Sequence, residues 1–233
     1  MINSHALYTL ILDSSLKKAC ILLCQDSHTL FFKTYDPSSS SIGAPSSVTL
    51  SLHLDEALKK TNITPQNIGQ IACGIGPGSY TGVRVAISIT QTLGFALNVP
   101  VAGFCALKAI EPIELCSKKA IDLKTARVID ARSGGLFVLE EDEKEPKKIA
   151  IEEIGAWLKG ISAILTPHPK IIQEKFSSLE LLKPGIENGN KSAPAVLEAD
   201  FCSNSLIECG LKALKAAKRD LSPIYLGKGH NLF

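Results

Sequence analysis

The chain has 233 residues, of which 45% are hydrophobic and 21% charged, and its net charge is +2 at pH 7. This composition is ordinary for a globular protein, and so small a charge gives no electrostatic reason to expect direct nucleic-acid binding. Seven cysteines without a Cys-x-x-Cys pair argue against a disulfide framework and a zinc knuckle, and they favour a reducing compartment. With no signal-like leader and no uninterrupted apolar span, we expect a cytoplasmic protein without membrane contact.

Three short apolar runs at residues 8–12, 19–24 and 29–33 are separated by the polar segments SSLKK and QDSH. This spacing predicts a three-stranded antiparallel meander with Asp13 at its first turn. Because aspartate readily accepts hydrogen bonds from nearby turn amides, we expect Asp13 to stabilise that turn.

A polar loop at residues 34–47 precedes a predicted helix at residues 48–60, in which apolar residues recur four apart. His53 on this helix has no second metal-ligand residue at helical spacing, so we expect it at an exposed or edge position rather than in a metal site. Thr64 and Pro65 predict a short helical turn leading into the next strand.

Residues 71–101 read as a strand, a glycine-rich turn, a helix and a second strand, and the other elements are arranged around them. Gly74, Gly76 and Gly78 enforce the turn, while Ser79 and Thr81 can each cap the helix that follows. We expect this helix to cover residues 82–98.

The central helix has two unlike faces. The apolar stripe expected to face the sheet comprises Val85, Ile89, Leu93 and Ala96, with Ala86 and Leu97 beside it. The opposite face carries Arg84, Ile87, Ser88, Gln91 and Phe95, of which only the arginine is charged. Since a solvated helix normally carries several charges, this face is covered either by another chain or by the protein's own domain, and the pattern favours neither.

A phosphate group could bind where the glycine turn meets the helix N-terminus. The candidate residues for such a weak site are Asp13, Gly76, Gly78, Ser79 and Thr81. However, GPGSYTG lacks the Walker lysine and the GxGxxG spacing, and no acidic residue follows at the distance of a ribose-binding carboxylate. A tight connection without a ligand is therefore favoured.

The second half begins with a predicted helix at residues 105–120, and we place the boundary between an N-terminal lobe, 1–103, and a C-terminal lobe, 104–233. ARVIDAR and GLFVLEED predict a hairpin around Ser133 to Gly135, in which Asp130 and Arg132 serve as structural anchors. A helix, a strand and a helix follow at residues 151–158, 161–165 and 169–176.

A last helix is predicted to be capped by Ser203 or Asn204 and to end in a basic cluster. We interpret this cluster, which contains Lys215, Lys218 and Arg219, as a solvated face rather than an RNA-binding patch.

GPGSYTGVRVAISITQTLGFA resembles the signature of the TsaB (YeaZ-like) family, the dimerisation subunit of the bacterial machinery that makes threonylcarbamoyladenosine in tRNA. Three further stretches agree in order and spacing: LILDSS at residues 10–15, VIDARSGGLFV at 128–138 and SPIYLG at 222–227. The family's histidine before the helix predicted at residues 48–60 is replaced here by Ser46 or Ser47, and the glycine that follows the first-hairpin aspartate in the wider ATPase superfamily is replaced by Ser14.

The resemblance implies an α/β, actin-like (ribonuclease H-like) fold of two lobes with mixed sheets. It further implies a non-catalytic scaffold that pairs with a TsaD-like catalytic subunit, acts with a TsaE-like ATPase, forms a homodimer in isolation and meets tRNA only through the complex. No metal and no cofactor are expected, with ATP or ADP only at a shared interface. The expected partner interface comprises Leu52, Arg84, Ile87, Ser88, Gln91 and Phe95.

Two alternatives stay open. A small actin-like ATPase or kinase with weak nucleotide binding would need a complete phosphate hairpin, which the replacement at Ser14 puts in doubt. A peptidase would need HExxH or GxSxG, neither of which occurs, and the five histidines are scattered singly along the chain.

Overall fold

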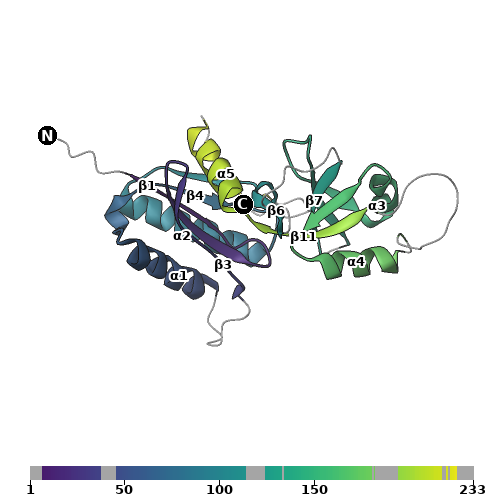
Figure 1. Cartoon of the computed structure of the whole chain (residues 1–233), viewed down its shortest axis with the longest axis horizontal. Coiled ribbons are helices and arrows are strands. Elements are labelled where there is room, and N and C mark those ends of the chain that lie inside the picture. The colour runs from purple at the N-terminus through teal and green to yellow at the C-terminus, as the bar shows by residue number, and fades with distance from the viewer. Residues whose placement is uncertain are drawn as a thin grey trace. The chain divides into compact units, whose positions relative to one another are not determined.

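A computed structural model describes residues 7–37, 46–113, 124–132, 134–179, 181, 194–216, 219 and 221–224. The chain divides into two compact units (Figure 1). Unit 1 contains Met1–Ala109 and Phe201–Tyr225, and unit 2 contains Ile110–Asp200 and Leu226–Phe233.

Unit 1 is built on a five-stranded sheet in the order β3-β2-β1-β4-β5. Its strands are β1 (Tyr8–Asp13), β2 (Ala19–Gln25), β3 (His28–Tyr35), β4 (Ile68–Gly74) and β5 (Val101–Phe104). β1, β2 and β3 pair antiparallel, while β4 pairs parallel with both β1 and β5. The predicted meander is therefore confirmed, and so is the strand that leads into the glycine turn.

Helices cover both faces of this sheet. The helices α1 (Ser46–Thr61) and α2 (Tyr80–Leu97) share a buried core with Leu10, Leu12 and Ile71, and the short helix η2 (Pro65–Asn67) joins α1 to β4. Because neighbouring strand residues point to opposite faces, Ile11 lies on the other side, where Gly210 of α5 (Ser203–Lys215) packs against it. In Figure 1 the yellow α5 lies across the purple strands from α1, although it comes from the far end of the chain.

Unit 2 repeats this plan. Its sheet has the order β6-β11-β10-β7-β8-β9. The strands are β6 (Ile110–Pro112), β7 (Thr125–Asp130), β8 (Gly135–Glu140), β9 (Lys147–Ala150), β10 (Ala163–Thr166) and β11 (Ala195–Phe201), and the helices are α3 (Ile151–Leu158) and α4 (Pro169–Ser178). Counted from β9, the order β9-β8-β7-β10-β11 corresponds to the order β3-β2-β1-β4-β5 of unit 1. β6 is an additional strand at the far edge. Two mixed sheets with one topology agree with the expected α/β fold of two actin-like halves.

The predicted helix at residues 105–120 is wrong over its described part. The 3₁₀-helix η3 (Ala106–Ala109) is followed by β6, which pairs with β11 in the second sheet, while residues 114–120 lie outside the described range. The backbone NH of Ala106 donates to the carbonyl of Gly76 at 2.8 Å, which holds the start of this segment against the glycine turn. Contacts with residues far away in the sequence, in β11 and the glycine turn, therefore prevent the helix that the local pattern predicts.

The two units also divide differently from the expected lobes 1–103 and 104–233. The first unit continues to Ala109, and Phe201–Tyr225 returns to it because α5 packs on β4 and β5. β11 was not predicted at all. The N-cap of α5 is Cys202 rather than Ser203 or Asn204, and Leu206, Ile207, Gly210 and Leu214 form its buried side.

Within the described residues, no helix is both long and apolar enough to cross a membrane.

Candidate functional site

The glycine turn is closed by the β1–β2 turn of the same unit. The backbone NH of Ser79 donates to the carbonyl of Ser15 at 2.6 Å, and the Ser14 hydroxyl donates to the carbonyl of Gly82 at 2.6 Å. A Cβ added at Gly78 would lie 2.2 Å from the Ser15 oxygen, so the two backbones touch. Protein atoms thus occupy the place where an anion would approach the first turn of α2.

The structure brings together only some of the residues that were predicted as a weak phosphate-binding site. Ser79 is the N-cap of α2, as predicted, and its hydroxyl accepts from the backbone NH of Gly82 at 3.3 Å. Gly76 is buried with φ of +93°, while Thr81 is exposed on the other side of the helix start. Since the amide of Ser79 and the carbonyl of Gly76 are used inside the protein, the geometry favours a structural turn over a phosphate loop.

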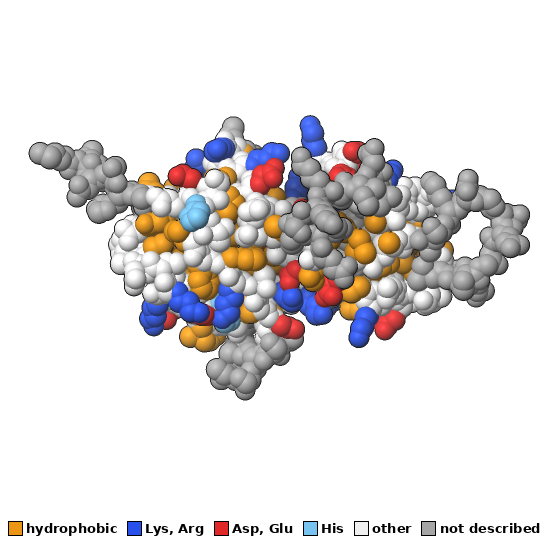
Figure 2. Space-filling view, viewed as in Figure 1, with side chains coloured by type: hydrophobic (Ala, Val, Ile, Leu, Met, Phe, Trp, Pro, Cys, Tyr) orange, Lys and Arg blue, Asp and Glu red, His pale blue; other side chains and the backbone are white. Residues whose placement is uncertain are grey.

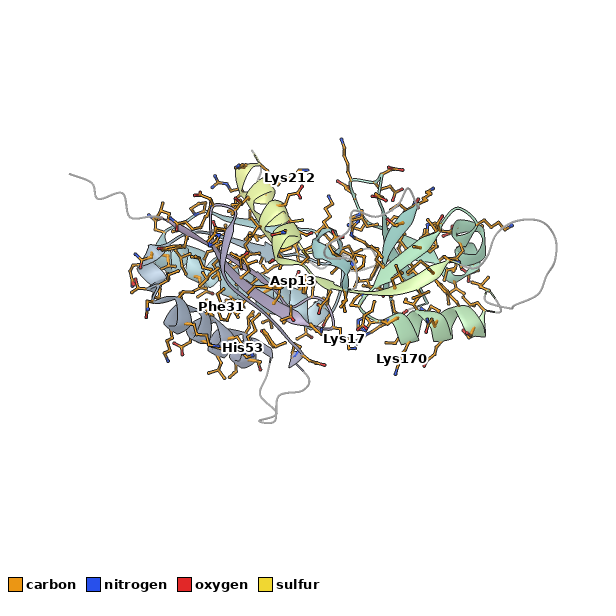
Figure 3. The ribbon with its side chains drawn as sticks, in the orientation of Figure 1. Asp13, Lys17, Phe31, His53, Lys170 and Lys212 are labelled. Atoms are coloured by element: carbon orange, nitrogen blue, oxygen red, sulfur yellow. The ribbon has the colours of Figure 1, made fainter. Side chains whose placement is uncertain are left out.

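Asp13 lies at the end of β1 inside unit 1 (Figure 3) and is fully buried. Its Oδ1 accepts from the backbone NH of Ser15 at 2.5 Å, which agrees with the expected turn-stabilising role. Its Oδ2 has no hydrogen-bond partner among the described residues. Burial raises the pKa of the Asp13 carboxyl to about 6, against the opposing effect of the hydrogen bonds from Ser15.

The central helix is rotated relative to the predicted stripe. Its buried residues are Gly82, Val83, Ala86, Ile87, Thr90 and Gly94, so Ile87, expected on the outer interface, faces the core instead. Small residues on the buried side let α2 lie close to the sheet: a Cβ added at Gly94 would come within 2.3 Å of Val101. The larger Val85, Ile89 and Leu93 are consequently only partly buried, and Ala96 is exposed.

The remaining interface candidates do lie on one exposed surface, formed by α1 and α2. We define this docking face as Val48 and Leu52 of α1 with Tyr80, Arg84, Ser88, Gln91 and Phe95 of α2. Phe95 is 91% exposed, Leu52 54% and Val48 45%. An open groove of about 410 Å³ crosses the face and is lined by Ser47, Tyr80, Thr81, Arg84, Val85, Ser88 and Ile89. Large apolar groups in water beside a groove are typical of a protein-binding surface.

A charged cluster borders this face where α1 meets β3. Glu56 accepts from Lys33 at 2.6 Å, pairs with Lys60 at 2.8 Å and lies 3.1 Å from Nδ1 of His53. Hydrogen bonds from these three side chains lower the pKa of the Glu56 carboxyl to about 2. In Figure 2, Lys and Arg groups (blue) gather along the lower edge of unit 1, in the region of α1. The cluster ties α1 to the sheet.

His53 lies near Phe31 of β3 at this junction (Figure 3), and its ring packs 4.1 Å from that of Tyr35. The expectation of an edge position is therefore confirmed. Among the described residues, no group of three or more His, Cys, Asp or Glu side chains could hold a metal ion.

In unit 2, Asp130 is an anchor of the predicted kind. Lys175 of α4 pairs with Asp130 at the end of β7 and donates to the carbonyl of Gly135 at 2.9 Å. One ammonium group thus joins both strands of the hairpin to the helix. Arg132 has φ of +46° and is exposed in the turn, and Ser133 lies outside the described residues.

The last family motif, SPIYLG, is described up to Ile224. The backbone NH of Ile224 donates to the carbonyl of Ile75 at 2.8 Å, next to the glycine turn. Three of the four quoted motifs, which are far apart in sequence, therefore meet at this turn, because Ser15 of LILDSS also binds Ser79.

Comparisons with known proteins agree with these motifs. The model of the family TsaD, tRNA N6-adenosine threonylcarbamoyltransferase, matches residues 44–218. The chain is 40% identical over 152 residues to the tRNA threonylcarbamoyladenosine biosynthesis protein TsaB of Buchnera aphidicola subsp. Baizongia pistaciae, covering 65% of this chain and 64% of that protein. It is 27% identical over 116 residues to TsaB of Bacillus subtilis, covering 50% of this chain and 46% of that protein.

The matches therefore span about half to two thirds of the length of these relatives. Among solved structures, YeaZ from Pseudomonas aeruginosa superposes with a TM-score of 0.64 at 18% identity and covers 94% of this chain and all of that one. This likeness confirms the expected two-lobed α/β fold. The family match and the motifs lead to one conclusion: the chain belongs to the TsaD family, and within that family it is similar to the TsaB (YeaZ-like) proteins.

Proposed function

We propose that this chain is a non-catalytic subunit of the machinery that makes threonylcarbamoyladenosine in tRNA, and that it binds a TsaD-like catalytic subunit through the docking face. The names of its relatives place them in this biosynthesis. The observation that carries the proposal for this chain is the docking face itself, where Phe95 exposes 91% of its surface on the same helix that supplies most of the groove lining.

The closed glycine turn supports the non-catalytic part of the proposal. Phosphate chemistry needs free amides at the helix start, and here the amide of Ser79 is bound to Ser15. Asp13 is held in the turn by Ser15 and is fully buried. The unit supplies a rigid surface rather than an open site.

The rest of the assembly follows from the same role. We propose that a TsaE-like ATPase acts on the complex, that tRNA is held through the partner subunit, and that ATP or ADP binds only at a shared interface. A net charge of +2 supports indirect contact with tRNA, because nucleic-acid binding requires a concentrated basic surface. In isolation the exposed face would be covered by a second copy, giving a homodimer in the cytoplasm.

The test is a binding titration of Phe95→Asp with a TsaD-like subunit. If the ring enters the interface, the substitution places an unpaired charge in a buried contact at a cost of several kcal/mol, which weakens Kd by about two powers of ten or more. Since Phe95 is 91% exposed in the single chain, the fold of that chain should survive the substitution, with a circular dichroism spectrum like that of the unmodified chain.

Ile171→Asp is the matched control, because Ile171 is a 43%-exposed apolar residue on the helix α4 of unit 2. It should bind the partner as the unmodified chain does. Unweakened binding by Phe95→Asp would remove α2 from the interface. ATP turnover that disappears in Asp13→Ala would instead favour an actin-like ATPase.

A further inference from the structure

The docking face carries a single charged side chain. Arg84 is the only charged residue of α2, and its guanidinium lies 4.4 Å from the centre of the Tyr80 ring. This cation–π contact orients the guanidinium without neutralising it. Among the described residues, no acidic side chain forms a salt bridge with Arg84, so within this part of the chain its charge is not neutralised.

The surroundings of Arg84 add to its positive potential. Ser47 from the start of α1, and Tyr80 and Thr81 from the start of α2, all line the same groove. Neither helix has an acidic residue in its first turn, so the positive ends of both helix dipoles are uncompensated there. The groove therefore combines an oriented guanidinium, hydroxyl groups and two helix N-termini.

A partner that covers this groove removes Arg84 from water. An unpaired buried charge is costly, whereas a carboxylate that forms two parallel hydrogen bonds with the guanidinium offsets that cost. We propose that Arg84 is a specificity-determining residue of the docking face, which pairs with a carboxylate of the TsaD-like partner. The inference rests on the proposed function and concerns which partner the face selects.

A second copy of this chain is a poor source of that carboxylate. α2 carries no acidic residue, and the two acids of α1 are already engaged: Asp55 pairs with Lys59 at 2.6 Å, and Glu56 with Lys33 and Lys60. A homodimer through this face would bury the Arg84 side chains of both copies. Neither copy has a carboxylate on α1 or α2 that is not already paired with a lysine. The docking face can therefore bind a second copy, but it binds a partner that supplies a carboxylate more tightly. The difference between these two affinities is the specificity of the face.

The experiment compares Arg84→Lys, Arg84→Gln and Arg84→Glu in titrations with a TsaD-like subunit and, separately, in sedimentation equilibrium of the chain alone. Partner binding should weaken a few-fold for Lys, about tenfold for Gln and at least about a hundredfold for Glu, since Lys keeps the charge and loses only the planar fork. Self-association should be unchanged or tighter in Arg84→Gln.

Lys59→Glu is the matched control for the change in net charge. Lys59 is an exposed residue of α1 twelve positions after Ser47, which places it about 18 Å along the helix from the groove. This variant should bind the partner within about threefold of the unmodified chain, whereas a single acid-to-arginine change at the pairing carboxylate of the partner should restore binding of Arg84→Glu.

The outcomes separate the inference from the proposed function. If Arg84→Gln binds the partner normally while Phe95→Asp does not, the interface is correct and the role of Arg84 is wrong. If Arg84→Gln weakens self-association as much as partner binding, the arginine does not select between partners. If neither Arg84→Glu nor Phe95→Asp affects partner binding, the docking face itself is refuted.

Discussion

The two units share one strand order, yet their helices differ in length and in outer surface. In unit 1, α1 has 16 residues and α2 has 18, and Arg84 is the only charged residue of α2. In unit 2, α3 has 8 residues with two glutamates in its first turn, and α4 has 10 residues with Lys170, Glu174 and Lys175 along it. The two units thus share a common sheet but differ in the length and outer face of its helices, and the proposed docking face lies on the longer helices of unit 1.

A second contrast concerns the aspartates that end two corresponding strands, β1 in unit 1 and β7 in unit 2. Asp13 is fully buried and accepts a hydrogen bond from the amide of Ser15, whereas Asp130 is paired with Lys175. The same position is therefore closed by backbone contacts in unit 1 and by an ion pair in unit 2. Three substitutions test this difference, beginning with the largest expected effect.

Gly78→Val should destabilise unit 1 by about 3 kcal/mol or more, because its Cβ would lie 2.2 Å from the carbonyl oxygen of Ser15. No positive φ is involved at this residue; close approach of two backbones is the cause. Gly160→Val in unit 2 is the control, since its nearest neighbours would be 3.7 Å away, and it should cost about 1 kcal/mol or less. Urea unfolding of both variants measures the difference, and equal midpoints would show that the turn can move apart.

Asp13→Asn should stabilise the protein at pH 8 by about 2 to 3 kcal/mol, because the buried carboxylate is then charged and the amide is not. The pKa of Asp13 is raised from 3.8 to about 6 in the folded protein. The folded state therefore holds a proton that the unfolded state loses, and the stability contributed by protonation is present at low pH and lost as pH rises from about 4 through about 6.

Melting curves of Asp13→Asn and the unmodified chain between pH 4.5 and 8 check this dependence. The variant should gain most above pH 6 and little at pH 4.5, while its oxygen still accepts from Ser15. A loss of stability at every pH would mean that the charged carboxylate has a favourable partner in the turn.

Lys175→Met should cost unit 2 about 1 to 2 kcal/mol, a smaller effect because Asp130 and Lys175 are both partly exposed and their pairing is screened by water. The loss combines the ion pair with the hydrogen bond to Gly135. Adding Asp130→Asn to Lys175→Met should recover part of the loss, since the unpaired carboxylate is then gone. A double variant that is additive with the two single changes would show that the residues are not coupled.

Much of unit 1 followed from local pattern in the sequence. Alternating apolar runs and polar turns identified the meander, Ser79 was correctly predicted as the cap of α2, and the glycines located the turn. The family motifs identified the relatives and the two-part fold. These features depend on neighbouring residues, whose spacing and turn chemistry can be read along the chain.

Long-range packing decided the rest. Ile87 is buried because small residues at Gly82, Ala86 and Gly94 draw that side of α2 onto the sheet, a rotation that a count of apolar positions did not reveal. β6 forms instead of a helix because β11, about 85 residues further along the chain, pairs with it.

In the candidate site, too, some features follow from local sequence and others from long-range packing. The predicted interface had six residues, of which the folded chain exposes five, Leu52, Arg84, Ser88, Gln91 and Phe95, and buries Ile87. The sequence also named a possible phosphate turn, but only tertiary structure could bring Ser15 onto Gly78 and Ser79 from more than sixty residues away. Local spacing determines which groups a helix presents, whereas contacts between distant segments determine which of them remain free to bind.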